Sequence, residues 1–226
     1  MVQKSKYTSY LVTIDGPAAS GKSTVSRQIA AQFGWEWVST GAFYRGLAYV
    51  AQRLGVVLDD ERALAELAES DRWSVQLGAD KTRVFLGKED VSSAIYGEDV
   101  GAYASKVSQY PLVRSSLLEA QRQCAVGVRG LVAEGRDCGT VVFPQAPVKI
   151  YLTAHQESRA QRRAEEKGES LGATLEAQVQ RDAQDSQRQA APLQVPAGAT
   201  VVDTSELTLE QVVAAVREIV EKTLNP

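Results

Sequence analysis

The 226-residue chain contains only two cysteines, Cys124 and Cys138, and a single histidine, His155. Two cysteines and one histidine supply neither the framework of a disulfide-stapled protein nor the ligand spacing of a zinc site. We therefore interpret both cysteines as packing residues of a protein kept in a reducing compartment. We expect His155 to be a helix cap or a surface residue, without a role in proton transfer.

The sequence also lacks a long apolar run and an excess of charge of either sign. Only a few consecutive apolar residues precede Asp15, too few for a signal-peptide core or a membrane span. Lys and Arg number 25 and Asp and Glu 28, so the formal net charge of -3 gives no sign of a nucleic-acid or membrane surface. The sequence predicts a cytoplasmic protein with small-molecule partners, neither nucleic acid nor membrane, and we expect a monomer.

Segments typical of strands and of helices alternate along the chain, which is the signature of an α/β fold. Short, mostly apolar segments predict parallel strands at residues 10–14, 35–39, 130–134, 148–153 and 199–203. Apolar residues spaced three or four apart predict helices over 22–33, over 43–54 with Leu54 facing inward, and from Pro111 onward. Thr208 and Gln211 form a capping box for a terminal helix.

The pattern changes between about residues 59 and 93, and helical sequence resumes near Gly97. A short helix near Leu64 is followed by "WSVQL" and "TRVFL", which alternate apolar and polar residues around "GADK" and predict an antiparallel hairpin. Residues 156–168 are almost wholly polar, so we expect a mobile helical flap standing in solvent. The predicted molecule is a three-layer α/β unit with a core of residues 8–58, 108–154 and 172–226, an insertion at 59–107 and a lid at 155–171.

The strongest motif is "GPAASGKST", which fits G-x-x-x-x-G-K-[ST] between a predicted strand and a predicted helix. Its backbone N–H groups and the positive end of the helix dipole are expected to face phosphate oxygens. Lys22 would reach the β- and γ-phosphates, and the Ser23 hydroxyl would complete a Mg²⁺ shell. The motif predicts an ATP or GTP site made of Gly16, Pro17, Ala18, Ala19, Ser20, Gly21, Lys22, Ser23 and Thr24. The alternative is a glycine turn with an exposed lysine.

The sequence contains neither an N-K-x-D guanine-reading motif nor an L-S-G-G-Q motif, which argues against a GTPase and a transporter ATPase. A kinase acting on a small acceptor suits the size of the chain. If that acceptor is a phosphate, its oxygen is already largely anionic, since the second pKa is about 6. The transfer then needs positive charge to hold two polyanions together, and arginine supplies a permanent two-pronged cation.

One polar stretch near the end of the chain has two interpretations. "QRDAQDSQRQAAPL" places Arg181, Asp185 and Arg188 on one helical face. Alone, these residues are most simply a solvated helix that pairs its own charges. Behind a phosphate-binding loop, they are candidates for a clamp on sugar and phosphate.

Five stretches together extend the assignment: "GPAASGKST", "STGAFYR", "ASKVSQYPLVR", "EGRDCGTVVFPQAPVKIYL" and "RDAQDSQRQAAPL". From about residue 11 to residue 204 the chain resembles the bacterial cytidylate kinases, of the nucleoside monophosphate kinase group. The resemblance implies a P-loop α/β kinase that transfers the γ-phosphoryl of ATP to CMP, and to dCMP, with Mg²⁺. It also implies that the insertion binds the monophosphate and that the lid closes over the nucleotide.

The resemblance also assigns roles to individual residues. By position, Arg45, Arg136 and Arg188 grip the acceptor phosphate, and Ser105, Arg114 and Asp137 read the cytosine edge. Asp185, with Arg181 beside it, holds the sugar hydroxyls, and Thr40 belongs to the CMP site. Arg159, Arg162 and Arg163 are the lid arginines, of which Arg162 contacts ATP. The implied catalytic set is Lys22, Arg136, Arg159, Arg162 and Arg188.

Several alternatives remain open on the sequence alone. Ser105 and the lid arginines are also compatible with an ordinary helix cap and a solvated helix face. Glu134 and Thr40 stand where family members often have Asp and Ser. The chain could instead phosphorylate UMP, another monophosphate or shikimate, or bind a nucleotide without transfer. The preference between CMP and dCMP, the tolerance of UMP and the extent of lid closure are left open.

Overall fold

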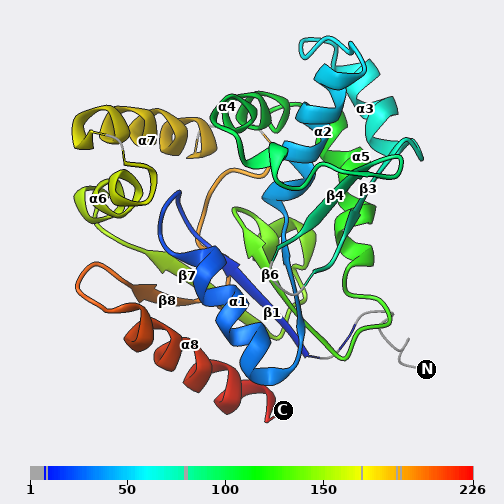
Figure 1. The fold of residues 1–226 in the computed structure, drawn as a ribbon. Coiled ribbons are helices and arrows are strands. Elements are labelled where there is room, and N and C mark those ends of the chain that lie inside the picture. The colour runs from blue at the N-terminus through cyan, green and yellow to red at the C-terminus, as the bar shows by residue number, and fades with distance from the viewer. Residues whose placement is uncertain are drawn as a thin grey trace.

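A five-stranded, entirely parallel sheet runs through the centre of the molecule in the order β2-β6-β1-β7-β8 (Figure 1). The computed structural model describes residue 8 and residues 10–78, 81–168, 170–186, 188 and 190–225. The strands of this sheet are β1 (Tyr10–Asp15), β2 (Glu36–Ser39), β6 (Gly130–Gly135), β7 (Val148–Thr153) and β8 (Thr200–Asp203). All five lie where the sequence predicts strands.

Helices cover both faces of the sheet and complete three layers. One face packs against α1 (Lys22–Phe33) and α8 (Leu209–Leu224), around Val12, Ile14 and Val216. The other face packs against α2 (Gly41–Arg53) and α5 (Pro111–Gln123), around Leu11, Leu47 and Leu131. Alternate residues of β1 therefore enter opposite cores, as expected of a strand buried on both sides. The predicted three-layer α/β architecture is confirmed.

The strand register brings polar residues together at the carboxyl edge of the sheet. Asp15 ends β1 opposite Gly135 of β6 and Tyr151 of β7, and Ser39 ends β2 opposite Glu134. The chain leaves β1 toward β2 on one side and later returns to β7 on the other, which makes β1 a topological switch point. Ligands of open parallel sheets bind outside the carboxyl ends of the strands at such a point.

A second, three-stranded antiparallel sheet belongs to the segment between α2 and α5, and its strands β3 and β4 are seen below the α2 label in Figure 1. Its strands are β3 (Trp73–Gln76), β4 (Arg83–Leu86) and β5 (Glu89–Asp90). The same segment holds α3 (Glu61–Glu69), a 3-10 turn at Ala94–Tyr96 and α4 (Glu98–Val107). The predicted hairpin is confirmed, and α3 packs against α5 while α4 packs against α2.

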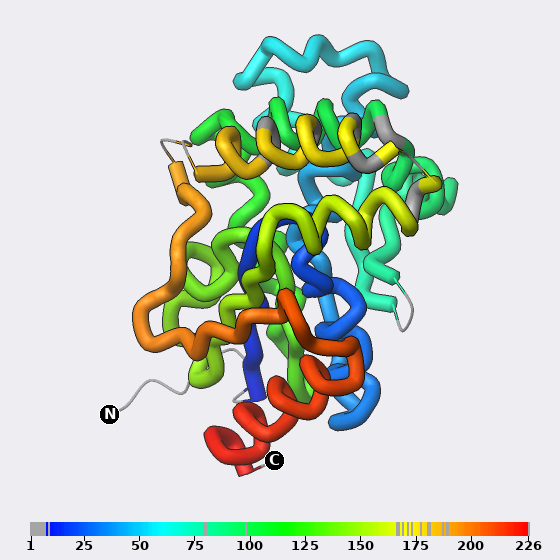
Figure 2. Tube along the Cα trace, turned by 90° about the vertical axis from the view of Figure 1, so that its left-hand side faces the viewer, coloured from blue at the N-terminus to red at the C-terminus, as the bar shows by residue number. Residues whose placement is uncertain are grey.

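Helices α6 (Gln156–Lys167) and α7 (Leu171–Ser186) lie side by side beyond the carboxyl edge of the main sheet, and α7 runs beside α4 (Figure 2). The helix predicted over 156–168 is confirmed, but the expectation that it stands in solvent is wrong for one face. Ala160 is fully buried and Arg159 is 7% exposed. Arg159 is buried by its hydrogen bonds to Ala154, Ala18 and Asp182, a form of burial that hydrophobic patterning does not predict.

Most of the local sequence signals correspond to what the structure contains. Pro111 opens α5, and Thr208 and Gln211 make the reciprocal hydrogen bonds of a capping box. Leu54 is an exception, since it is 39% exposed beyond the end of α2 and does not join the inward face. Cys138 is buried and Cys124 half-buried, both as free thiols.

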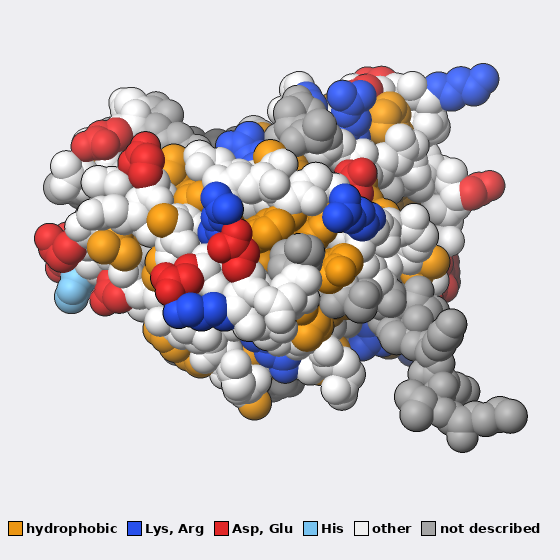
Figure 3. Space-filling model, turned by 90° about the horizontal axis from the view of Figure 1, so that it is seen from below, with side chains coloured by type: hydrophobic (Ala, Val, Ile, Leu, Met, Phe, Trp, Pro, Cys, Tyr) orange, Lys and Arg blue, Asp and Glu red, His pale blue; other side chains and the backbone are white. Residues whose placement is uncertain are grey.

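Basic and acidic side chains are interspersed on the face of the molecule seen from below (Figure 3). This agrees with the small net charge of the chain. None of the helices in the described ranges has both the length and the apolar character needed to cross a bilayer.

Two glycines provide a matched test of the packing at the edge of the core. A Cβ on Gly130 would lie 2.5 Å from two ring atoms of Trp35, and that ring is stacked on Phe33 at 4.6 Å and on Tyr10 at 5.5 Å. We expect Gly130→Ala to lower the free energy of unfolding by about 1–3 kcal/mol, because the stacked ring has little room to move. Gly172 has no neighbour within 4 Å of such a Cβ, so Gly172→Ala should raise stability by about 0.5 kcal/mol.

Urea denaturation of the two variants and the wild type measures both effects. A Gly130→Ala variant as stable as the wild type would show that the Trp35 stack adjusts freely.

Candidate active site

The loop of residues 16–21 connects β1 to α1 and is shaped by backbone conformations that favour glycine. Gly16 has a φ of +150°, and a Cβ there would lie 2.0 Å from the carbonyl oxygen of Leu152 in β7. Gly21 has a φ of +85° and immediately precedes the first turn of α1. The loop thus wraps the N-terminus of a helix, where free N–H groups and the helix dipole favour an anion. The predicted phosphate-binding loop has the strand and helix context that it requires.

Lys22 lies inside this loop instead of extending into solvent. Its Nζ donates to the carbonyl oxygen of Pro17 at 2.5 Å and lies 3.4 Å from Ser20 Oγ. The side chain is 6% exposed, and burial, with the nearby charge of Arg136, lowers the pKa of Lys22 to about 7. The alternative of a glycine turn with an exposed lysine is therefore wrong.

Oxygen-bearing side chains gather beside the lysine. Ser23 Oγ donates to Glu134 Oε1 at 3.0 Å. Asp15 accepts from the backbone N–H groups of Cys138 at 2.8 Å and Gly139 at 2.7 Å, and burial raises its pKa to about 6 despite these bonds. The Ser23 hydroxyl and the Glu134 carboxylate together offer oxygen ligands of the kind that Mg²⁺ prefers. Glu134 bonds directly to Ser23 here, so the longer acid still reaches the loop.

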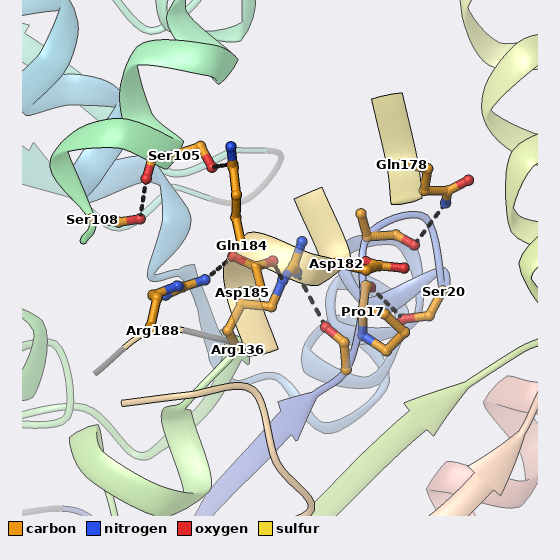
Figure 4. Close-up of polar contacts among 12 residues, drawn as sticks. Pro17, Ser20, Ser105, Ser108, Arg136, Gln178, Asp182, Gln184, Asp185 and Arg188 are labelled. Carbon is orange, nitrogen blue, oxygen red and sulfur yellow. Dashed lines mark hydrogen bonds and ion pairs between the residues drawn. The ribbon is translucent and has the colours of Figure 1, made fainter. Parts of the chain in front are cut away.

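Two arginines from different parts of the chain converge on one carboxylate. Arg136, just after β6, donates from Nε to Asp185 Oδ2 at 2.6 Å and from Nη1 to the Gly16 carbonyl oxygen at 3.1 Å. Arg188 donates from Nη2 to Asp185 Oδ1 (Figure 4). Burial lowers the pKa of Arg136, and burial with the charges of Arg114 and Arg136 lowers the pKa of Arg188 to about 10. The clustered cations are thus destabilised by desolvation and by each other.

The expected pairing of Asp185 with Arg188 within one stretch is confirmed, but Asp185 also bonds Arg136, which follows β6. The self-contained, solvated helix is therefore wrong. The side chain of Arg181 lies outside the described part of the structure, so its place beside Asp185 stays a prediction.

A second buried ion pair lies behind this cluster. Arg114 of α5 donates from Nη2 to Asp137 Oδ2 and from Nη1 to the Ser108 carbonyl oxygen at 3.0 Å. Its guanidinium lies 5.3 Å from the centre of the Tyr44 ring. Arg114 and Asp137 are 8% and 4% exposed. The two residues therefore form a fixed donor and acceptor pair.

The remaining residues assigned to CMP come from α2 and α4. Thr40 Oγ1 donates to the Glu134 carbonyl oxygen at 3.0 Å. Arg45 donates from Nη1 to the Ile95 carbonyl oxygen at 3.0 Å, with Tyr96 5.7 Å from its guanidinium. Ser105 Oγ donates to Gln184 Oε1 of α7 at 2.7 Å, so Ser105 bonds across two helices instead of capping its own (Figure 4).

The arginines predicted to belong to a lid face different groups. Arg159 donates from Nη1 to Asp182 Oδ2 at 2.6 Å and to the Ala18 carbonyl oxygen of the loop at 3.1 Å. Arg162 donates to the hydroxyl of Thr204 at 3.0 Å and to its carbonyl oxygen at 2.5 Å. Arg162 and Arg163 line the cavity described next, whereas Arg159 is buried between α6, α7 and the loop.

A cavity of about 1040 Å³ joins these groups. Of the residues predicted for the site, it is lined by Ala18, Ala19, Ser20, Gly21, Lys22, Ser23, Thr24, Thr40, Arg45, Ser105, Arg136, Asp137, Arg162, Asp185 and Arg188. Gly16, Pro17, Arg114 and Arg159 do not line it but bond to residues that do, or shape the loop. The structure therefore brings most of the predicted phosphate loop, most of the predicted arginines and Asp137 to one cavity.

Four residues near the site escaped the sequence analysis: Asp15, Tyr44, Gln178 and Asp182. Asp15 is a carboxylate that ends a buried strand directly before the loop, and this position in the sequence could have identified it as a site residue. Gln178, Asp182 and Asp185 are spaced four and three apart on α7, and all three touch buried partners. Polar residues at the spacing of a packed helical stripe were the signal that could have identified them.

Comparison with known proteins assigns the family. A family model described as cytidylate kinase matches residues 12–222. The chain belongs to the cytidylate kinase family. The cytidylate kinase of Bdellovibrio bacteriovorus is 58% identical over 214 residues, which cover 95% of this chain and 99% of that protein. The cytidylate kinase of Methylococcus capsulatus is 45% identical over 220 residues, covering 93% and 96% of the two chains.

Solved structures support the same fold. A gluconokinase from Sinorhizobium meliloti superimposes with a TM-score of 0.53 and 14% identity, covering 97% of this chain and 95% of its own. An uncharacterized protein from Eubacterium ventriosum gives a TM-score of 0.54 with 10% identity, over 93% of this chain and 98% of its own. At these identities the likeness concerns the fold alone.

The lowered pKa of Lys22 gives a prediction about proton uptake. At pH 8 a lysine with a pKa of about 7 is mostly neutral in the free protein. Bound phosphate favours the charged form of Lys22 and raises its pKa. The protein should therefore take up about one proton when ADP binds. The nucleotide itself contributes little, since phosphate with a second pKa of about 6 is already ionised. Binding should therefore weaken as the pH rises from 7 toward 9.

Calorimetry of ADP binding at pH 8 in two buffers of different ionisation enthalpy measures this uptake. Lys22→Met, which has no titrating amine, is the control and should show little uptake. Equal binding enthalpies in both buffers for the wild type would contradict the prediction.

Proposed function

We infer that the protein catalyses the ATP-dependent phosphorylation of CMP. The observation that carries this function is the single cavity that has a phosphate-binding loop on one wall and Arg136, Asp185 and Arg188 on another. The buried pair of Arg114 and Asp137 adds a fixed donor and acceptor for a base. Membership of the cytidylate kinase family supports the same function.

We propose that the loop and the arginines do most of the work of phosphoryl transfer. The loop N–H groups and Lys22 hold the donor phosphates, while Arg136 and Arg188, with Arg45, hold the acceptor phosphate. The acceptor oxygen is already anionic near neutral pH, so transfer requires no general base. Fixed cations instead offset the repulsion between two polyanions and hold them in line for a loose transition state. Arg159 and Arg162 would stabilise the transferring group, with Arg162 also on ATP.

The acceptor base is read by hydrogen-bond polarity. Cytosine offers acceptors at N3 and O2 and a donor at its 4-amino group, which match Arg114 as donor and Asp137 as acceptor. Uracil would present a carbonyl oxygen to the carboxylate and leave two acceptors facing each other, a mismatch that strongly disfavours binding. Ser105 lies in the same cavity, and Thr40 would complete the CMP site. Asp185, with Arg181 beside it, would hold the sugar hydroxyls.

Mg²⁺ fits the oxygen donors beside the loop. Ser23 would hold it together with the nucleotide, and Glu134, whose Oε1 accepts from Ser23 Oγ, would neutralise or bond its shell. When bound there, it would supply positive charge that offsets the negative charge developing on the transferring group. With Mg²⁺ bound, the loop, Lys22 and the arginines would keep the phosphate-binding roles proposed for them.

The chain is also divided into segments with different roles. We propose that residues 59–107 form the monophosphate-binding segment, that 155–171 form the lid, and that residues 8–58, 108–154 and 172–226 form the core. Closure of lid and insertion would exclude water and so prevent hydrolysis of ATP. On the sequence, we also propose that the protein uses dCMP as an acceptor, is a monomer and is located in the cytoplasm.

The first test is the choice of acceptor. The purified protein is offered ATP, Mg²⁺ and one acceptor at a time from CMP, dCMP, UMP, AMP, GMP and shikimate, and ADP formation is measured. We expect the highest kcat/KM with CMP, activity with dCMP, and much less with the others. A rate at background with CMP would contradict the function, and ATP binding without transfer to any acceptor would support a nucleotide-binding module.

The second test concerns base selection. Asp137→Asn keeps an oxygen for Arg114 and adds an amide N–H₂ that donates to the 4-carbonyl of uracil. The ratio of kcat/KM for CMP to that for UMP should fall at least about tenfold, since a mismatched buried group becomes a matched one. Glu66→Gln, a neutralisation on α3 away from the cavity, serves as the matched control. Selectivity unchanged in Asp137→Asn would remove Asp137 as the base reader.

A further inference from the structure

The carbonyl oxygen of Ala18, in the middle of the phosphate-binding loop, accepts hydrogen bonds from two side chains outside the loop. Arg159 Nη1 of α6 donates at 3.1 Å and Gln178 Nε2 of α7 also donates at 3.1 Å. Gln178 is 2% exposed and Arg159 is 7% exposed. Figure 4 shows Gln178 reaching the loop from α7. Neither donor lines the cavity, so both hold the loop from the side of α6 and α7.

These two bonds fix the direction of one peptide group. The described chain contains no cis peptide bond, and in a trans peptide the C=O and the following N–H point in opposite directions. Holding the Ala18 carbonyl toward α7 therefore turns the Ala19 N–H away from α7. Ala19 itself has a φ of +58°, a left-handed conformation that a residue with a Cβ keeps only when its surroundings impose it.

We propose that Gln178 is a positioning residue for the donor-phosphate site, which holds the Ala18 carbonyl so that the Ala19 N–H is oriented for a phosphate oxygen before the nucleotide arrives. This inference rests on the proposed use of ATP. Preorganisation of a binding loop strengthens binding, because the ordering is completed before the ligand binds.

The partners of the two donors differ. Arg159 also bonds Asp182 at 2.6 Å and the Ala154 carbonyl oxygen at 3.1 Å, and its proposed lid role requires it to turn toward the nucleotide. Gln178 is the donor that keeps the Ala18 carbonyl when Arg159 moves. Its position on α7 needs no such movement.

Packing alone does not account for Gln178. Among the described residues, its Oε1 is buried and has no hydrogen-bond partner. A buried amide oxygen without a partner destabilises the folded state, and an apolar side chain of similar size would avoid that cost. A residue placed only for the fold would gain stability on replacement by Met or Leu, which makes stability and ATP binding separable.

The test compares Gln178→Met and Gln178→Leu with the wild type. We expect the KM for ATP to rise about two- to tenfold, the range that corresponds to one hydrogen bond. The kcat and the KM for CMP should stay within about twofold, because the loss falls on binding and not on the transition state alone. The Kd for ATP, measured by calorimetry without CMP, should rise by the same factor. The thermal midpoint should be unchanged or higher.

Glu176→Gln is the matched control, since Glu176 is exposed on the same helix. It should match the wild type in every measurement. An unchanged KM and Kd for ATP in both Gln178 variants would overturn the proposal. A lower thermal midpoint, with ATP and CMP parameters changed together, would overturn it in favour of a structural role. If the wild type failed to phosphorylate CMP, the proposed function would fall, and the Kd for ATP would still decide the role of Gln178.

Discussion

The rest of the site depends on how buried positive charge is balanced at the carboxyl edge of the sheet. Arginine side chains 114, 136, 159 and 188 are all largely withdrawn from water, and each is paired with a carboxylate. An unpaired buried cation is strongly destabilising, whereas a paired one is tolerated when its hydrogen bonds are satisfied. A site built to receive two polyanions must therefore carry its own anions until the ligands arrive.

Helix α7 supplies much of this counter-charge. Asp182 pairs with Arg159 and Asp185 with both Arg136 and Arg188, while Gln178 of the same face bonds the loop. The helix is thus held by polar contacts to the core, to α6 and to α4. The same ion pairs that hold α7 in position also neutralise the arginines of the empty cavity. Movement of the helix would strip several arginines of partners at once.

The sequence predicted those parts of the molecule that follow from local rules. Strand and helix periodicity located all five strands of the main sheet, and the glycine and lysine spacing located the phosphate loop because Gly16 and Gly21 need conformations that other residues avoid. The resemblance to a family then assigned the arginines, and the cavity collects most of them. Pairings between distant segments, such as Asp185 with Arg136, depend on the fold and were not predictable from either segment alone.

The polar helices show where pattern reasoning failed and why. Residues 156–168 have almost no apolar side chains, so an amphipathic criterion predicts exposure, yet Arg159 is buried by three hydrogen-bonded partners. Gln178 escaped for the same reason, since a glutamine on a charged helix normally faces water. Burial here follows from hydrogen bonding, which leaves no periodic apolar signal.

The paired arrangement also suggests how the site discriminates between its own carboxylates and a substrate phosphate. Asp185 offers one negative charge shared between two guanidiniums, whereas a nucleoside monophosphate carries close to two charges and three acceptor oxygens. We propose that the phosphate competes well for Arg136 and Arg188, each of which would bind it with a planar pair of donors. Asp185 would then have free oxygens that require donors, and sugar hydroxyls would supply them. An acceptor that brings phosphate without a hydroxyl partner would leave this carboxylate buried and unpaired, so the counter-ion of the empty site would select nucleotides over simple phosphates.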